Sequence, residues 1–98
     1  MLNAKMLKQM QGRLQKMEEE LANLQVEASA GGGVVKVTAD GQQKILSIEV
    51  DPSVLEAGDA EMLQDLLVVA VNDALGQARD AAAKQVAGIT GNLKIPGL

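Results

Sequence analysis

The basic side chains at the amino end of this chain are the residues best suited to bind another molecule. Lys5, Lys8, Arg13 and Lys16 are the only charged side chains among the first sixteen residues. The rest of the chain has five basic and thirteen acidic side chains, so the formal net charge is −4. Because a polyanion responds to the local surface potential, a compact basic stripe can bind it even on an acidic protein.

The side chains that most enzymes use as nucleophiles or metal ligands are scarce. The chain has no Cys and no His, which excludes a Ser-His or Cys-His nucleophile and an ordinary zinc site. Turn, strand and cap positions explain Ser29, Ser47, Ser53 and the acids between residues 49 and 59. The glycines at 31–33 lack the Lys-Ser/Thr pair of a phosphate-binding loop. We expect no enzyme, metal, cofactor or small-molecule substrate.

Apolar residues in the amino-terminal segment repeat with the spacing of a heptad. These residues are Leu7, Met10, Leu14, Met17, Leu21 and Leu24. The spacing predicts a helical arm over residues 1–28, before the glycines at 31–33, with a coiled-coil-like seam that packs against another helix. The four cations cover an arc of about 140° on this helix, nearly opposite the seam. One face is therefore expected to be buried while the other meets an anion.

The middle of the chain has the pattern of a β-hairpin over residues 34–50. A β-branched run is followed by Asp40 and Gly41, which both tolerate the positive φ of a tight turn. Apolar residues then alternate with polar ones in the second strand and should share a buried face. These residues are Leu46, Ile48 and Val50.

A long helix is predicted over residues 59–89, with Asp59 as its N-cap. Its first half is apolar on nearly every side and should lie deep in the fold. The alanines at 81–83 make the second half slim, and residues 90–98 have the composition of a loose tail. The fold class is α+β, and 98 residues is the length of one domain spanning 1–98.

The composition indicates a homo-oligomer in the cytosol. Hydrophobic residues make up 47% of the chain, yet there is no Phe, Trp or Tyr, so the core must be thin and aliphatic. A chain with such a core can gain stability by burying apolar surface against a second copy of itself. No continuous apolar run is long enough for a membrane span or a signal peptide, so we expect no membrane partner.

The chain resembles the YbaB/EbfC family of bacterial nucleoid-associated proteins over nearly its whole length. Besides the basic heptad helix and the glycine break, the resemblance rests on these segments: GVVKVT (33–38), DG (40–41), IEVDP (48–52), EMLQDLL (61–67), AVNDA (70–74) and PG (96–97). It implies a tweezer-like homodimer with a shared central sheet, whose terminal helical arms bind duplex DNA with little sequence preference. It also implies a cytoplasmic protein on the nucleoid, with possible effects on nucleoid organisation and gene expression.

Carried over position by position, the resemblance points to six DNA-binding residues: Lys5, Lys8, Arg13, Lys16, Arg79 and Lys84. Asp80 is placed to pair with Lys84 at i,i+4, which weakens the case for Lys84. The alanines at 81–83 depart from the family pattern, in which charged residues are commoner there.

An alternative from another class is a small coiled-coil adaptor or interaction protein that makes no direct contact with DNA. Its lysines would then only keep the protein in solution. If nucleic acid is the partner, the absence of aromatic side chains leaves no stacking platform for single strands. The duplex backbone is the better target.

Overall fold

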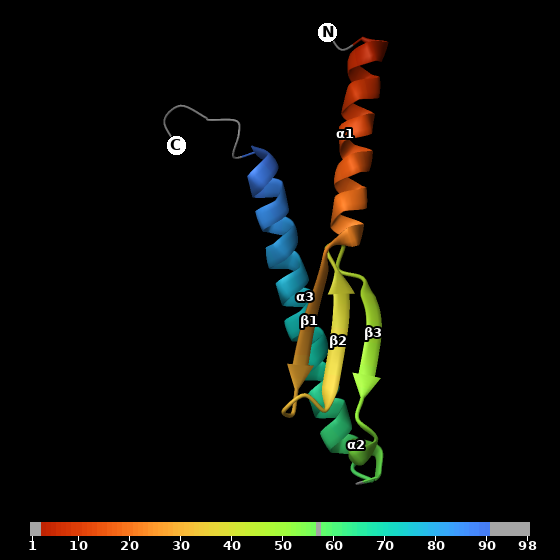
Figure 1. The fold of residues 1–98 in the computed structure, drawn as a ribbon, viewed down its shortest axis with the longest axis vertical. Helices are drawn as coiled ribbons and strands as arrows, with labels where there is room; N and C mark the ends of the chain where they lie inside the picture. Colours follow the sequence, from red (N-terminus) through yellow and green to blue (C-terminus); the bar gives the residue numbers. More distant parts are fainter. Residues whose placement is uncertain (1–2, 57, 91–98) are drawn as a thin grey trace, which may run out of the picture.

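Three antiparallel strands and a long helix form the body of the molecule, and the amino-terminal helix projects beyond one end of the sheet (Figure 1). The structure is a computed structural model, and it describes residues 3–56 and 58–90. The elements in chain order are α1 (Ala4–Asn23), β1 (Gln25–Ala30), β2 (Val35–Asp40), β3 (Ile45–Val50), α2 (Pro52–Glu56) and α3 (Ala60–Thr90).

The core lies between α3 and one face of the sheet. The strand order is β1-β2-β3, and Val37 in β2 is opposite Ala28 in β1 and Ile48 in β3. Helix α3 packs against β1 and β2, where fully buried side chains from both sides meet. These side chains are Val35, Val37 and Ala39 from β2, and Ala70, Ala74 and Ala78 from α3. Since alanine has only a methyl group, α3 can lie close to the strands.

The predicted helical arm over residues 1–28 is too long at its carboxyl end. Helix α1 stops at Asn23, its C-cap Leu24 is extended with φ −70° and ψ 128°, and residues 25–30 form β1. In β1, Ala28 and Ala30 are buried and alternate with exposed polar residues. Alanine favours helices in isolation, but pairing with β2 and close packing under α3 override that preference. A strand that depends on such distant partners is hard to recognise locally.

The predicted burial of the second hairpin strand is also wrong. Strand β3 is present and pairs with β2, with a register shift between Thr38 and Ala39. Leu46 and Ile48 are nevertheless exposed, and Val50 is only partly buried. The physical reason is the narrow footprint of α3, which covers β1 and β2 but leaves β3 beyond its edge.

Helix α3 was expected to lie deep in the fold over its first half, and only one side of it does. Ala70 is buried against the sheet, whereas Val68 and Val69 are 59% and 58% exposed on the outer sides of the helix. The single sheet offers only one surface to pack against. An apolar helix surface of this kind is normally covered in an assembly.

The β2–β3 connection is a hairpin turn, as the sequence predicts, but its special backbone conformation lies elsewhere. Gln43 has φ 62°, and neither Asp40 nor Gly41 has a positive φ. The Gln43 N–H donates to the Asp40 carbonyl at 3.0 Å. This matches a three-residue hairpin loop whose last residue is left-handed.

Two aspartates begin the carboxyl-terminal helices. The Oδ1 atom of Asp59 accepts a hydrogen bond from the Met62 N–H at 3.0 Å, so Asp59 is the predicted N-cap of α3. Asp51 accepts from the Ser53 N–H at 2.8 Å at the start of α2, and this bond lowers the pKa of the Asp51 carboxyl. Among the described residues, no helix combines the length and apolar character needed to cross a membrane. The predicted tail lies outside the described residues from 91 onward.

Replacing Ala74 with leucine should destabilise the protein by about 1–3 kcal/mol, because the larger side chain forces α3 away from the strands. Ala83→Leu is the matched control, since Ala83 is exposed on the same helix and surface changes usually stay within about 0.5 kcal/mol. Urea unfolding followed by circular dichroism measures both. Equal stability of the two variants would contradict the close packing described for α3.

Candidate nucleic-acid interface

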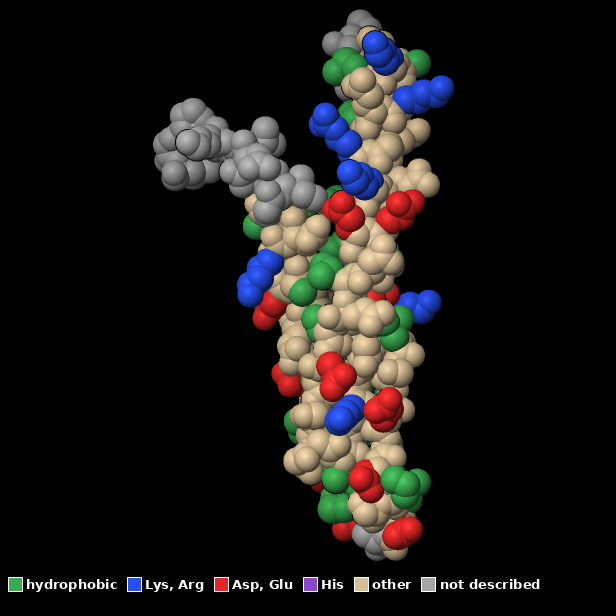
Figure 2. Space-filling view, in the orientation of Figure 1, with side chains coloured by type: hydrophobic (Ala, Val, Ile, Leu, Met, Phe, Trp, Pro, Cys, Tyr) green, Lys and Arg blue, Asp and Glu red, His purple; other side chains and the backbone are tan. Residues whose placement is uncertain are grey.

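The four amino-terminal cations all lie exposed on α1, beyond the end of the sheet. Figure 2 shows their positive side chains gathered on the projecting part of the molecule, whereas acidic side chains dominate the body. Helix α1 begins at Asn3, whose Oδ1 accepts from the Met6 N–H at 2.8 Å, and no acidic residue occupies its first turn. The positive end of the helix dipole therefore adds to the field of the lysines.

The cations of α1 have no partner in the described part of the chain. The structure records no hydrogen bond or ion pair for the side chains of Lys5, Lys8, Arg13 and Lys16 within residues 3–56 and 58–90. An unpaired cation on an exposed helix keeps its full capacity to contact an external anion. The arrangement therefore suits binding of a polyanion.

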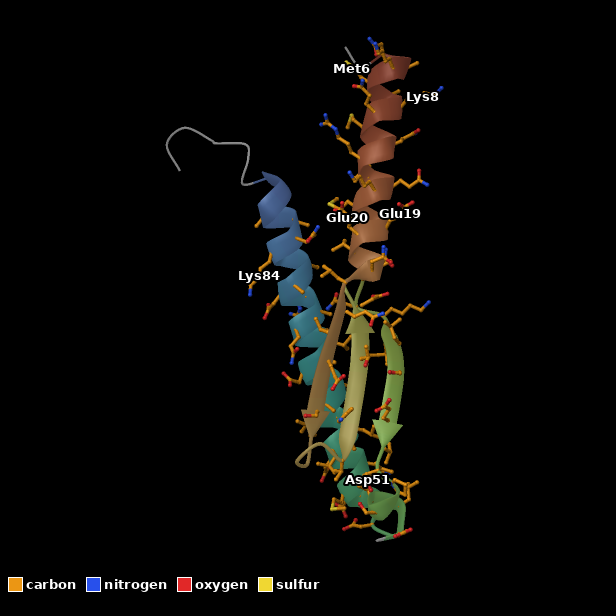
Figure 3. The ribbon with its side chains drawn as sticks, viewed as in Figure 1. Met6, Lys8, Glu19, Glu20, Asp51 and Lys84 are labelled. Carbon is orange, nitrogen blue, oxygen red and sulfur yellow. The ribbon has the colours of Figure 1, made fainter. Side chains whose placement is uncertain are left out.

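Three consecutive glutamates end the basic surface. Glu18, Glu19 and Glu20 begin two residues after Lys16, and Figure 3 shows Glu19 and Glu20 to either side of α1 in this view. Glu20 lies on the side of α3, where its Oε2 accepts a hydrogen bond from Gln85 Nε2 at 3.1 Å. The sign of the charge thus changes within one helical turn, at the level where α1 meets the body.

The heptad seam divides into two halves. Met17, Leu21 and Leu24 are partly buried near the body, whereas the outer seam residues remain open to solvent. These are Leu7, Met10 and Leu14, with 46%, 48% and 54% of their surface exposed. The inner half therefore closes within one subunit, and the outer half has no cover among the described residues.

A hollow of about 220 Å³ on α1 is lined by Arg13, Lys16, Met17 and Glu20. Its two cations are one helical turn apart on one side of the arm, and the carboxylate of Glu20 is engaged by Gln85. Because two of its four lining residues are cationic, the hollow can bind an anionic group.

The two candidates on α3 are separate from the α1 cations. Arg79 and Lys84 are both exposed, and Figure 3 shows Lys84 on the side of α3 that faces away from α1. The expected ion pair of Lys84 with Asp80 does not form in the described part of the chain. The structure therefore assembles four of the six predicted residues on one element and leaves two outside it.

Sequence reasoning missed three residues that hold α1 on the body. The Gly41 N–H donates to the carbonyls of Leu21 and Leu24, Gln42 Nε2 donates to the Glu18 carbonyl at 3.2 Å, and Gln85 contacts Glu20. No local pattern reveals these contacts, because Gln42 and Gln85 are 24 and 65 residues from their partners. Of the three residues, only Gly41 stands out in the sequence, where it indicates a turn and not a contact with α1.

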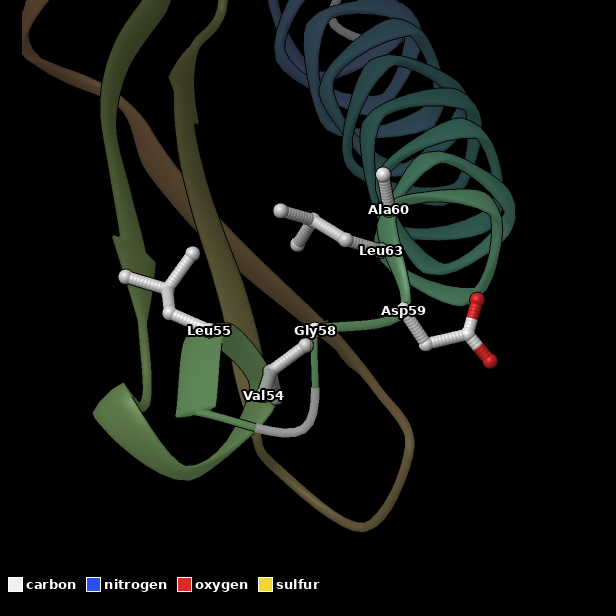
Figure 4. A pocket seen from close by; sticks show the side chains of 6 residues that line it. All are labelled: Val54, Leu55, Gly58, Asp59, Ala60 and Leu63. Carbon is white, nitrogen blue, oxygen red and sulfur yellow. The ribbon is translucent and has the colours of Figure 1, made fainter.

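A second hollow differs in its lining from the one on α1. The hollow between α2 and the start of α3 is lined mainly by apolar groups such as Val54, Leu55 and Leu63 (Figure 4). Its one charged side chain, Asp59, caps α3. Within residues 3–56 and 58–90, no three acidic side chains gather closely enough to hold a metal ion.

Comparisons with known proteins support the fold and identify the family. The model of the YbaB/EbfC DNA-binding family matches residues 1–93. Nucleoid-associated proteins of Desulforamulus reducens and Pelotomaculum thermopropionicum are 55% and 51% identical to the chain; the matches cover 96% and 97% of it and 92% and 93% of the relatives. The crystal structure of an uncharacterized protein from Helicobacter pylori matches 90% of this chain and 98% of its own, with a TM-score of 0.63 and 26% identity. The chain belongs to the YbaB/EbfC DNA-binding family.

Proposed function

We propose that this protein is a non-catalytic, nucleoid-associated protein that binds duplex DNA through α1, largely independently of sequence. The observation that carries the proposal is the set of four exposed, unpaired cations on a helix that projects from an acidic body. Curated relatives named as nucleoid-associated proteins support the same function. They give no support to the alternative of an adaptor without DNA contact.

The chemistry of the arm favours the DNA backbone over the bases. Lysine and arginine neutralise phosphates and release counterions, which gives affinity without reading sequence. The chain has no aromatic side chain to stack on an unpaired base. Three of the four cations are lysines, which act as point charges and lack the planar fork with which arginine reads guanine. Lys5, Lys8, Arg13 and Lys16 are accordingly proposed as phosphate contacts, with Arg79 and Lys84 as secondary ones.

The uncovered apolar surface supports a homodimer. Ile48 in β3 is 47% exposed on the same face of the sheet as Val37, and Val68 and Val69 of α3 are also exposed. The sheet has β1 and β3 as its edges, and an edge strand is a template for pairing with another chain. A second copy that extends or covers the sheet would bury this surface. It would also present the basic arm twice, which raises affinity for one duplex through avidity.

A location on the nucleoid in the cytoplasm follows from DNA as the partner. Two arms on one assembly can contact neighbouring stretches of duplex, which gives a physical route to effects on nucleoid organisation and gene expression. Phosphate contacts tolerate any sequence, so such effects would depend on occupancy along the DNA.

Removing two charges from the arm should weaken duplex binding equally on unrelated sequences. The variant is Lys5→Gln with Lys8→Gln, and the plot of log affinity against log salt should flatten by about 1.8 for each arm in contact. Fluorescence anisotropy of labelled duplexes over a salt series measures both effects. The control is Lys36→Gln with Lys44→Gln, which changes the net charge equally on the exposed sheet. Equal loss in both variants would contradict a specific role of α1.

Removing the negative charges at the base of the arm should strengthen binding. The change Glu18→Gln with Glu19→Gln is expected to raise affinity about two- to tenfold at low salt, because exposed charge pairs contribute a few tenths of a kcal/mol or more each. The gain should shrink as salt rises. Glu56→Gln with Glu61→Gln, at the far end of the body, is the matched control. An equal gain there would mean that only the total charge matters.

A charge placed on the uncovered face of β3 should break the proposed dimer. Ile48→Lys introduces an unpaired charge into the expected interface, whereas Ser47→Lys places the same charge on the opposite face of the strand. Sedimentation velocity should find a dimer for the Ser47 variant and a monomer for the Ile48 variant. A monomeric unmodified protein would refute the dimer.

A further inference from the structure

The direction of the α1 arm depends on a small number of contacts at its base. Helix α1 contacts the body mainly through β2, and its outer length extends beyond the sheet (Figure 1). The chain itself connects α1 to β1 through the extended residue Leu24, which by itself does not define an angle. The contacts at this junction must therefore set the direction.

The β2–β3 turn caps the carboxyl end of α1. The last carbonyls of a helix lack intrahelical donors. Here the Gly41 N–H donates to the Leu21 carbonyl at 2.8 Å and to the Leu24 carbonyl at 3.1 Å. A helix is more commonly capped by a glycine that directly follows it. In this molecule the cap comes from a residue that is distant in the sequence, so the cap also joins two elements.

Position 41 has no room for a side chain. A Cβ atom there would lie 2.6 Å from the Leu21 carbonyl oxygen and 3.2 Å from the Leu21 Cα. These are backbone atoms and cannot rotate aside. The φ of Gly41 lies outside the left-handed region, so the requirement for glycine comes from the close approach of α1 and not from the turn conformation.

Hydrogen bonds within the β2–β3 turn fix its conformation, so the turn can support the end of α1. The carboxylate of Asp40 is buried, and its Oδ1 accepts hydrogen bonds from the N–H groups of Gln42 at 2.9 Å and Lys44 at 3.0 Å. The Asp40 N–H donates to the Lys44 carbonyl at 2.9 Å. Motion of Gly41 would therefore disturb the end of the hairpin.

Two glutamines hold α1 at neighbouring points. Gln42 Nε2 donates to the Glu18 carbonyl from the turn, and Gln85 Nε2 donates to the Glu20 carboxylate from α3. Together with the Gly41 cap, these contacts join α1 to two separate parts of the body. Contacts from two directions restrict rotation of the helix more than a single cap does.

We propose that the β2–β3 turn sets the direction of the DNA-binding arm and that Gly41 is its positioning residue. The proposal rests on the proposed function of α1. When two arms must contact one duplex together, the gain in affinity depends on whether the geometry allows simultaneous contact. A change in arm direction therefore weakens DNA binding without removing a phosphate contact.

The test compares Gly41→Ala with Gly12→Ala in the full chain. Gly12 lies on α1 with no atom within 4 Å of an added Cβ, so it is a matched control on the same helix. Because the protein has no cysteine, a dye at Gln9→Cys reports the motion of the arm alone by time-resolved anisotropy. Gly41→Ala should increase the amplitude of fast arm motion and weaken duplex binding about 10- to 100-fold. Gly12→Ala should do neither.

A second variant covers the case in which Gly41→Ala does not fold. Gln42→Ala with Gln85→Ala leaves the cap in place and should loosen the arm and weaken binding in the same direction, to a smaller extent. The proposal is overturned if a folded Gly41→Ala protein matches Gly12→Ala in arm motion, or if the arm loosens while affinity stays unchanged. If the unmodified protein binds no duplex, the proposed function fails, and the comparison of arm motion still decides the role of the turn.

Discussion

The packing of an alanine surface of α3 onto two valines of β2 determines which parts of the molecule are covered. Ala70, Ala74 and Ala78 let the helix lie close to Val35 and Val37, and dispersion contacts strengthen with such proximity. The same small side chains make the contact narrow. Helix α3 covers two strands, and Leu46 and Ile48 of β3 and the outer valines of α3 remain exposed. The uncovered surface and the thin core therefore both result from the small alanine side chains at this contact.

Positive and negative charge are separated along the molecule, between α1 and the body. The body is acidic and repels DNA, while α1 places four cations beyond the end of the sheet. Lysine near the positive end of a helix dipole and without a local acidic partner is unfavourable for helix stability. Proteins tolerate such local conflicts mostly at functional sites. The cations of α1 stay apart from the acidic side chains of the body only if α1 points away from the body. The junction at Gly41, where α1 meets the body, is therefore important.

Much of the fold was predictable where the signal is local. The spacing of Leu7, Met10 and Leu14 indicated α1, and Asp59 marked the start of α3 through its capping hydrogen bond. The turn at Asp40 and Gly41 was located correctly, although the glycine is required for a different reason. Strand β1 was missed because Ala28 and Ala30 have no local strand preference and are held by β2 and α3. Burial of Ile48 was predicted from alternation alone, which does not reveal where the covering helix ends.

The basic character of the amino-terminal arm, the lack of His and Cys, the hairpin and the family can all be read from the amino-acid sequence. These features depend on residue types and on spacings within a few helical turns or strand residues. Which side chains are covered, and how α1 is joined to the body, became clear from the folded structure. Those outcomes depend on the footprint of α3 and on the approach of Gly41 to Leu21, two contacts between segments that are far apart in the chain.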